Sequence, residues 1–434
     1  MRKEKIEIKK LGINGEGIGY VDKKVCFIDN ALPGEIVEVE LSTSHRKFYK
    51  GKVLKYIKTS PDRVQSICKE SQNCQGCALT SLLYDKQLLY KKGVLKDALK
   101  KYTDQRVDRL PIQNMIENPQ QTAYKKVVSL PVTYFKGKIG VGIYQRESKY
   151  LTLMNQCPMQ DSLINQTLLE IETILNDCGI RDYNDKVKKG LRFLRLKNID
   201  GAIQVLLVTG QDGISEEVTK KISQISQVKS IYLTINTSRY QDFELQGYKK
   251  IYGQATLPFQ CFNQQYLYSV KSEFPINPQM EEKKLSIIKS FIPVNASVLS
   301  LYCGVGLLEN AIDNDVVGVD NQQYHIKDAN DNAKFLRKDN ARFLCKDIDE
   351  AIVTQCKKNH FDVLVIQKGT LTTAIKQSMI ISKIPHILYV SDHPSSIAKD
   401  LQDINSYYDI EKIIPLDTYP NTLKMEVIVK LKRK

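Results

Sequence analysis

Four cysteines are spaced so that their thiolates can meet at one metal centre. Cys68, Cys74 and Cys77 form a C-x5-C-x2-C cluster, and Cys157 follows much later. Zinc and a [4Fe–4S] cluster both accept four thiolates, so the donor set alone admits either group. Structural zinc sites typically use two close pairs of ligands, whereas three cysteines plus one distant cysteine favour the iron–sulfur cluster. The alternative is that all four are unrelated core cysteines.

The other six cysteines stand singly in apolar surroundings, where we expect a cysteine to pack as a small hydrophobic residue. They are Cys26, Cys178, Cys261, Cys303, Cys345 and Cys356.

A second set of candidate residues follows an apolar strand in the C-terminal half. The segment Val298–Gly306 reads VLSLYCGVG, and glycines at such a turn let the backbone approach a ligand closely. The next two strand candidates end in acidic residues. Asp320 can hold ribose hydroxyls, and Asp347 can face an adenine. The alternative is a plain Rossmann-like core with acidic loop ends. We expect a cofactor site made by Tyr302, Gly304, Gly306, Asp320 and Asp347.

The composition of the 434 residues favours a globular protein with a polyanionic partner. Hydrophobic residues make up 42% and charged residues 26%, and the net charge is +15. A positive net charge of this size suggests nucleic acid as the binding partner. The alternative explanation of the charge is a basic surface in a lysine-rich proteome. There is no run of about 18 apolar residues, and no apolar stretch follows the charged start MRKEKIEIKK. We therefore expect no membrane span, no secretory signal and a cytoplasmic protein.

The pattern along the chain predicts three parts. Residues 1–60 alternate apolar and polar residues in short runs, with turn signals at the glycines of 15–19 and at Pro33-Gly34, which predicts an OB-like β-barrel. Residues 61–275 look mixed, with a helical segment at 79–102 that can pack on the C-terminal domain. From 276 to 434, strands alternate with helices and two late strands follow without a helix between them. The fold class is thus multidomain α+β, ending in a Rossmann-like α/β domain.

These motifs resemble the 23S rRNA uracil-C5 methyltransferases that carry a [4Fe–4S] cluster. Cys68–Cys77, then Tyr124-Lys125-Lys126 and Gly142-Ile-Tyr144, then Asn155-Gln156-Cys157-Pro158 match the order of that family's cluster segments. Gly15–Gly19 and Ala31–Glu35 resemble the TRAM domain, an RNA-binding barrel. The resemblance implies cluster ligation by the four cysteines, S-adenosylmethionine at the glycine turn and structured RNA as partner. The tRNA-specific branch lacks barrel and cluster, so the likeness points to 23S rRNA.

Compared with this family, the chain differs at the residue that acts as the nucleophile. In this family a cysteine thiolate adds to C6 of uracil, which makes C5 nucleophilic, and a base later removes the C5 proton. The nucleophile stands in a frame close to Tyr-Val-Ser-Cys-Asn-Pro, whereas this chain reads Tyr389-Val-Ser-Asp392-His393-Pro394. A carboxylate is a hard oxygen base and adds poorly to a conjugated ring. Glu426, in Pro420-Asn-Thr-Leu-Lys-Met-Glu426, keeps the place of the family base.

Further family positions are altered along the same chain. Gln367 follows the fourth strand where the family has Asp-Pro-Pro-Arg, and Pro275 stands where a glutamine contacts the cofactor. Ser300 replaces an acidic residue before Leu-Tyr-Cys-Gly. We therefore expect an RNA-binding pseudoenzyme that makes no 5-methyluridine. The alternatives are an active RNA methyltransferase with altered chemistry or target, and a cluster that senses redox state and modulates RNA binding.

Overall fold

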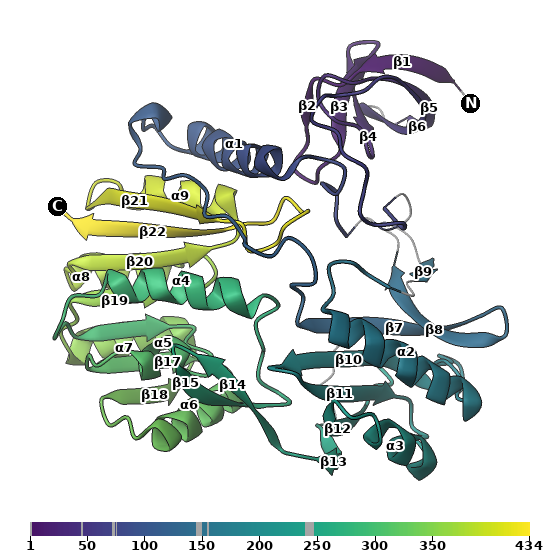
Figure 1. Ribbon diagram of the computed structural model, residues 1–434. Coiled ribbons are helices and arrows are strands. Elements are labelled where there is room, and N and C mark those ends of the chain that lie inside the picture. The colour runs from purple at the N-terminus through teal and green to yellow at the C-terminus, as the bar shows by residue number, and fades with distance from the viewer. Residues whose placement is uncertain are drawn as a thin grey trace.

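The chain folds into a barrel, a central seven-stranded sheet and a C-terminal seven-stranded sheet, which Figure 1 shows as three separate groups of strands. The computed structural model describes residues 2–44, 47–71, 74, 76–144, 150–153, 156–238 and 247–434. Gln72, Asn73, Gln75 and Asn155 of the cysteine motifs lie outside the described residues.

The N-terminal sheet has the strand order β1-β5-β6-β4-β3-β2, and contact between β1 and β3 closes it into a barrel. Its only fully buried carboxylate among the described residues is Glu35, which accepts hydrogen bonds from Arg63 Nε (2.5 Å) and from the backbone N–H of Leu32 (2.8 Å). The strands are β1 (Lys3–Glu7), β2 (Lys10–Leu11), β3 (Gly17–Val21), β4 (Lys24–Ile28), β5 (Ile36–Ser44) and β6 (Phe48–Lys58).

The glycines at 17 and 19 lie inside strand β3, so reading the whole 15–19 run as a turn is wrong for this part. A Cβ on Gly17 would stand 2.7 Å from the carbonyl oxygen of Ala31, and one on Gly19 would stand 2.2 Å from a methyl group of Ile6. Gly17 therefore allows close approach of the segment after β4, and Gly19 allows close approach of β1. Only Gly15, with φ of 87°, has the left-handed backbone of a turn glycine.

The central sheet has the order β13-β12-β11-β10-β7-β8-β9, and two helices pack on it around Leu168, Ile171, Val218 and Ile222. Asp161 begins α2 by accepting hydrogen bonds from the backbone N–H groups of Leu163 and Ile164. The elements are β7 (Val127–Phe135), β8 (Lys138–Tyr144), β9 (Leu151–Leu153), α2 (Ser162–Asp177), β10 (Leu191–Ile199), β11 (Ala202–Thr209), α3 (Glu216–Ser223), β12 (Val228–Ile235) and β13 (Lys249–Gly253).

The C-terminal sheet has the order β18-β17-β16-β19-β20-β22-β21, with β18 to β20 parallel and the last two strands antiparallel. The chain reverses its winding direction between β16 and β19, which is where doubly wound sheets bind ligands. The strands are β16 (Val298–Leu301), β17 (Val316–Asp320), β18 (Ala341–Cys345), β19 (Val363–Ile366), β20 (His386–Ser391), β21 (Tyr408–Leu416) and β22 (Glu426–Arg433).

Helices cover both faces of this sheet. One face packs against α1, α7, α8 and α9, and the other against α4, α5 and a hairpin that precedes residue 276. The hairpin is β14 (Thr256–Cys261) with β15 (Gln264–Ser269). The helices are α1 (Tyr84–Tyr102), α4 (Pro278–Ser290), α5 (Leu307–Ala311), α6 (Gln323–Leu336), α7 (Ile348–Lys358), α8 (Thr373–Ile381) and α9 (Pro394–Ile404), with a 3-10 turn at Val107–Arg109.

Helix α1 lies along α9, beside the last two strands of the C-terminal sheet (Figure 1). Its apolar side buries Leu95, Ala98 and Leu99 in the core of that domain. One turn earlier, the ammonium of Lys91 forms a fully buried ion pair with Asp417. No helix in the described part of the chain has the length and apolar character needed to cross a membrane.

Replacing Lys91 by methionine is expected to lower the free energy of unfolding by about 3–5 kcal/mol, because Asp417 is left buried and charged without its partner. Urea denaturation measures this loss. Lys327→Met is the matched control, since Lys327 pairs with Asp331 on the surface with 72% and 45% of the two side chains exposed. It should cost less than about 1 kcal/mol. Equal losses in the two variants would contradict the importance of the buried pair.

Candidate functional site at the carboxyl edge of the C-terminal sheet

The turn after β16 has the tight backbone that close approach of a ligand requires. Tyr302, Gly304 and Gly306 all have positive φ, at 60°, 55° and 76°. A Cβ on Gly306 would lie 2.8 Å from the ring of Phe343, so only glycine fits there. We call the residues that follow β16, β17, β18, β19 and β20 the carboxyl edge.

Asp320, at the end of β17, is buried and has both carboxylate oxygens engaged by its own chain. Oδ2 accepts from the backbone N–H of Gly304 (3.1 Å), and Oδ1 accepts from that of Gln322 (2.9 Å). The Nδ1 of His325 lies 3.1 Å from Oδ1. Burial acts to raise the pKa of Asp320, but the hydrogen bonds from His325 and the amides outweigh it and lower the pKa. The carboxylate is thus ionised and braces the glycine turn.

Asp347 follows β18 and begins α7. Its Oδ1 accepts from the backbone N–H groups of Asp349 (3.0 Å) and Glu350 (3.1 Å), the arrangement of an N-cap residue. Its side chain is exposed. Capping explains an acidic residue at this position without any ligand.

A buried network joins the ends of β16 and β19. The side-chain amide of Gln367 donates to Glu309 Oε1 (2.7 Å) and to Ser300 Oγ (3.0 Å). Glu309 is fully buried, and its Oε2 has no hydrogen-bond partner among the described residues. Burial raises the pKa of Glu309 to about 7. The buried carboxyl group between β16 and β19, where the sheet reverses its winding direction, is therefore that of Glu309 in α5. Positions 300 and 367, where the related family has acidic residues, carry a serine and a glutamine here.

Asp392 lies at the exposed end of β20. The Nδ1 of His393 contacts its Oδ1, and both side chains are more than half exposed. The strand before it is firmly held, because the hydroxyl of Tyr389 donates to Asp400 (2.9 Å) and to the carbonyl of Gly369 (3.1 Å). The frame is thus rigid, and the group that it presents is a carboxylate engaged by a histidine.

Glu426, the first residue of β22, is held on both oxygens. Lys284 of α4 donates to Oε1 (2.9 Å), and the hydroxyl of Thr418 donates to Oε2 (2.7 Å). Lys284 also pairs with Glu281 (2.7 Å). Burial acts to lower the pKa of Lys284, but the charges of Glu281 and Glu426 outweigh it and raise the pKa. Lys284 therefore stays an ammonium that pairs with Glu281 and Glu426.

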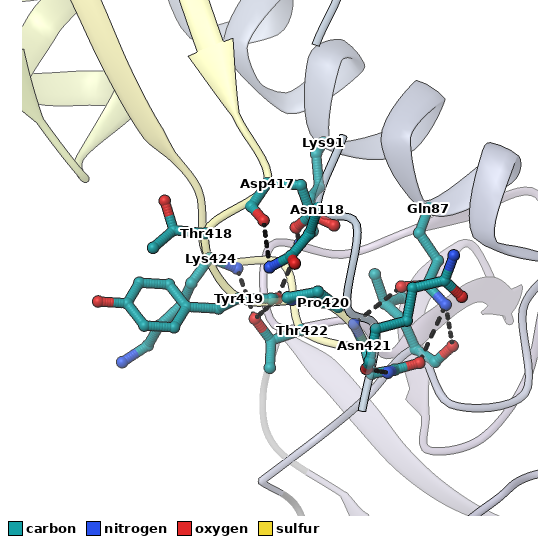
Figure 2. Close-up of polar contacts among 12 residues, drawn as sticks. Gln87, Lys91, Asn118, Asp417, Thr418, Tyr419, Pro420, Asn421, Thr422 and Lys424 are labelled. Atoms are coloured by element: carbon teal, nitrogen blue, oxygen red, sulfur yellow. Dashed lines mark hydrogen bonds and ion pairs between the residues drawn. The ribbon is translucent and has the colours of Figure 1, made fainter. Parts of the chain in front are cut away.

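Residues 417–424, which we call the junction loop, connect β21 to β22 and meet α1 (Figure 2). Lys91 reaches the loop from the helix and donates to Asp417 and to the carbonyl of Tyr419 (2.9 Å). The hydroxyl of Tyr84 donates to Asp417 Oδ2 (2.8 Å). Since Glu426 follows the loop by two residues, these contacts also fix the start of β22.

The four cysteines, called the cysteine site from here on, come near one another from two distant segments. Burial, followed by the charge of Cys157, raises the pKa of Cys68, and Cys74 shows the same two effects. Burial raises the pKa of Cys77 to about 11, while the nearby charge of Lys125 acts to lower it. Among the described residues, no group of three or more His, Cys, Asp or Glu side chains is placed to hold a metal ion.

Sequence reasoning missed four residues that the structure brings into play. They are Glu309, Lys284, Thr418 and Asn421. The signal for Glu309 was an acidic residue on the apolar side of a helix that directly follows a glycine turn. The roles of the others depend on partners more than 100 residues away or across a loop, so a single sequence carries no local signal for them.

Comparison with known proteins assigns the family. The TRAM domain model matches residues 2–54. An uncharacterized RNA methyltransferase of Bacillus cereus is 30% identical over 455 residues, which cover 99% of this chain and 96% of the relative. The chain belongs to this RNA methyltransferase family. Another uncharacterized RNA methyltransferase, from Streptococcus agalactiae, is 27% identical and covers 99% of this chain and 98% of its own length.

A solved structure matches this family member over its whole length. It is the Pyrococcus abyssi tRNA (uracil-54, C5)-methyltransferase in complex with S-adenosyl-L-homocysteine, at a TM-score of 0.79 and 21% identity, covering 99% of this chain and 100% of that chain. The fold class predicted from the sequence is confirmed, with a TRAM domain first and a methyltransferase fold last. Because a tRNA enzyme shares this complete layout, the layout does not separate rRNA from tRNA as substrate.

Replacing Glu309 by glutamine is expected to change how stability depends on pH. The pKa of Glu309 is about 7 in the folded chain against 4.5 for an ordinary glutamate. The native state therefore keeps a proton that the unfolded state loses, so the stability of the unsubstituted protein falls as pH rises from 4.5 to 7. From pH 5 to pH 8 it should lose about 2.5 kcal/mol relative to Glu309→Gln.

Urea unfolding at the two pH values measures the difference. The control is Glu350→Gln, on the exposed side of α7, which should leave the pH dependence unchanged. A constant stability difference between the Glu309→Gln variant and the unsubstituted protein across this range would contradict the raised pKa.

Proposed function

We propose that this member of the RNA methyltransferase family binds structured RNA and does not convert uracil to 5-methyluridine. The observation that carries the proposal is the carboxylate of Asp392 at the end of β20, in a frame that otherwise resembles the nucleophile frame of the uracil-C5 enzymes. Attack on C6 of uracil needs a soft nucleophile that is present as its anion, and a thiolate meets that need while a carboxylate does not.

The neighbouring groups support the same conclusion. Glu426, the proposed base, is engaged by Lys284 and Thr418, and Asp392 is engaged by His393. Without an adduct at C6 there is no acidic C5 proton for Glu426 to remove. We propose that Glu426 and Asp392 now serve structure and RNA contact.

The barrel supplies the proposed contact surface for RNA. Strand β6 carries exposed lysines at 52, 55 and 58 beside the exposed side chains of Leu54 and Tyr56. Such a mixture of cations and apolar or aromatic groups suits phosphate contact and base stacking. We propose 23S rRNA as the first partner to test and tRNA as its competitor, with the protein acting in the cytoplasm.

We propose the cysteine site as the holder of a [4Fe–4S] cluster. The charges of Cys68 and Cys157 act on both Cys74 and Cys77, and the charge of Lys125 favours the ionised form of those two thiols. The grouping of three close cysteines with one distant cysteine supports a cluster over zinc, because structural zinc sites typically use two close pairs. When bound, the cluster would cross-link residues 68–77 to Cys157.

We also propose that the chain divides into three domains, at residues 1–60, 61–275 and 276–434.

A second candidate function is methyl transfer to a position that needs no covalent adduct. The glycine turn with its ionised Asp320 favours it, because this turn can still receive S-adenosylmethionine beside Tyr302, Gly304, Gly306 and Asp347. Calorimetric titration with S-adenosylmethionine separates the two candidates. Binding together with a new methylated nucleoside other than 5-methyluridine would favour the second.

Purified protein is expected to bind 23S rRNA fragments with a steep inverse dependence on salt and, when supplied with S-adenosylmethionine, to produce no 5-methyluridine. Fluorescence anisotropy from 50 to 200 mM salt measures RNA binding, and mass analysis of nucleosides detects any 5-methyluridine. Lys52→Ala and Lys55→Ala should each reduce the salt slope by about one, whereas Lys327→Ala, on α6, should not. Appearance of 5-methyluridine would refute the proposal, as would absence of RNA binding.

Protein purified without oxygen is expected to contain iron and sulfide in the equal amounts of a [4Fe–4S] cluster, with the broad visible absorption of such clusters. Cys157→Ser should remove most of the iron because a thiolate ligand is lost. Cys178→Ser, at another partly buried cysteine, should leave the iron content unchanged. Stoichiometric zinc, or no metal in either form, would rule out the cluster.

A further inference from the structure

The barrel, the cysteine site and the C-terminal domain meet at one point beside the junction loop. Leu32 of the barrel packs with Leu79 and Leu82, which follow Cys77, and Leu423 of the junction loop packs against the same cluster. A Cβ on Gly15 would lie 2.4 Å from the Cβ of Ala78 and 3.6 Å from a methyl group of Leu423. The barrel turn therefore rests directly on the segment that leaves the cysteine site.

Asn421 is the polar centre of this junction. It is 5% exposed, and its φ of 65° is rare for a residue with a side chain. Its backbone N–H donates to Gln87 Oε1 (2.9 Å), and its carbonyl accepts from the backbone N–H of Leu79 (2.9 Å). Figure 2 shows Gln87 reaching from α1 to this residue. Asn421 thus ties the junction loop to α1 and to the first cysteine segment at once.

The side chain of Asn421 also reaches the second cysteine segment. Its Nδ2 donates to the carbonyl of Gln121 (2.9 Å) and contacts Met159 Sδ (3.4 Å), two residues after Cys157. Beside it, the buried hydroxyl of Tyr124 donates to the carbonyl of Pro420 (3.0 Å). The segments that follow Cys77 and Cys157 therefore both contact this loop.

From the junction loop the contacts continue to the carboxyl edge. The side-chain amide of Asn277, which begins α4, donates to the carbonyl of Thr418 (3.0 Å), and Thr418 holds Glu426. Helix α4 in turn supplies Lys284 to the same glutamate. A displacement of the junction loop would therefore move both groups that hold Glu426.

We propose that Asn421 is a positioning residue that couples the cysteine site to the junction loop. Whether the four cysteines hold their two segments together then determines whether the loop keeps its contacts, and with them the barrel contact and the affinity for RNA. This rests on the proposed RNA binding and cysteine-site function. While the two cysteine segments are held together, Leu79 and Met159 are fixed and Asn421 keeps all of its partners. When the segments separate, the loop loses these partners together and its backbone amides open to solvent.

A double-mutant cycle on the full chain tests the coupling. Asn421→Gly removes the side chain but keeps the left-handed backbone without strain, and Cys157→Ser removes one thiol. Hydrogen exchange of residues 417–425 and the affinity for a 23S rRNA fragment are the two measurements. Each single variant should raise exchange in the loop and weaken RNA binding about tenfold. The double variant should be no worse than the weaker-binding single variant.

Controls separate coupling from general destabilisation. Asn295→Gly makes the same substitution at another left-handed asparagine, which is exposed, and should change neither measurement. If Cys157→Ser does not fold, Met159→Leu replaces it in the cycle, because leucine keeps the volume of methionine and removes the sulfur contact.

The outcomes are distinct. Additive losses in the double variant, or unchanged exchange of residues 417–425 in either single variant, would overturn the coupling. Failure of the unsubstituted protein to bind RNA would refute the proposed function, and the exchange measurement would still decide the coupling.

Discussion

The buried ion pair between Lys91 and Asp417 is the interaction on which the arrangement of this protein depends. Neither charge tolerates burial without the other, so α1 has one acceptable position on the C-terminal domain. Once α1 is placed, Gln87 meets Asn421 and Tyr84 meets Asp417, which orders the junction loop. The barrel and the cysteine site are connected to the C-terminal sheet at this same place. A polar contact thus specifies the assembly, while Leu95, Ala98 and Leu99 of α1 pack in the core of the C-terminal domain.

The carboxyl edge keeps the framework of a methyltransferase fold. The turn with Gly304 and Gly306 has the backbone that a nucleoside cofactor needs, and Asp320 holds it in shape. By contrast, the carboxylates that face the reaction zone are occupied by the chain's own donors, from His393 to Lys284. Local rules of sequence are expected to be broken where chemistry demands it. Here the carboxylates of Asp392 and Glu426 both have hydrogen-bond partners within the chain.

The sequence predicted those features that depend on local pattern. The alternation of strands and helices expected from residue 276 onward is present, and the family frame located Asp392 at the end of a strand. Helix α2 was missed because its apolar residues follow a loop that gave no clear boundary, although Asp161 caps it. The strand at Gly17–Val21 was taken for a turn because glycine serves close packing as well as reversal. The role of Glu309 could not be predicted, since Gln367 meets it only in the folded sheet.

The distance along the chain between the two partners of the buried pair affects how the protein is made. Lys91 and Asp417 are 326 residues apart. At a ribosomal rate of about 5–20 residues per second, the lysine waits on the order of tens of seconds before its partner is synthesised. During that time α1 has no surface on which to bury its apolar side. The apolar side of α1 therefore stays without its partner α9 until that part of the C-terminal domain has been synthesised.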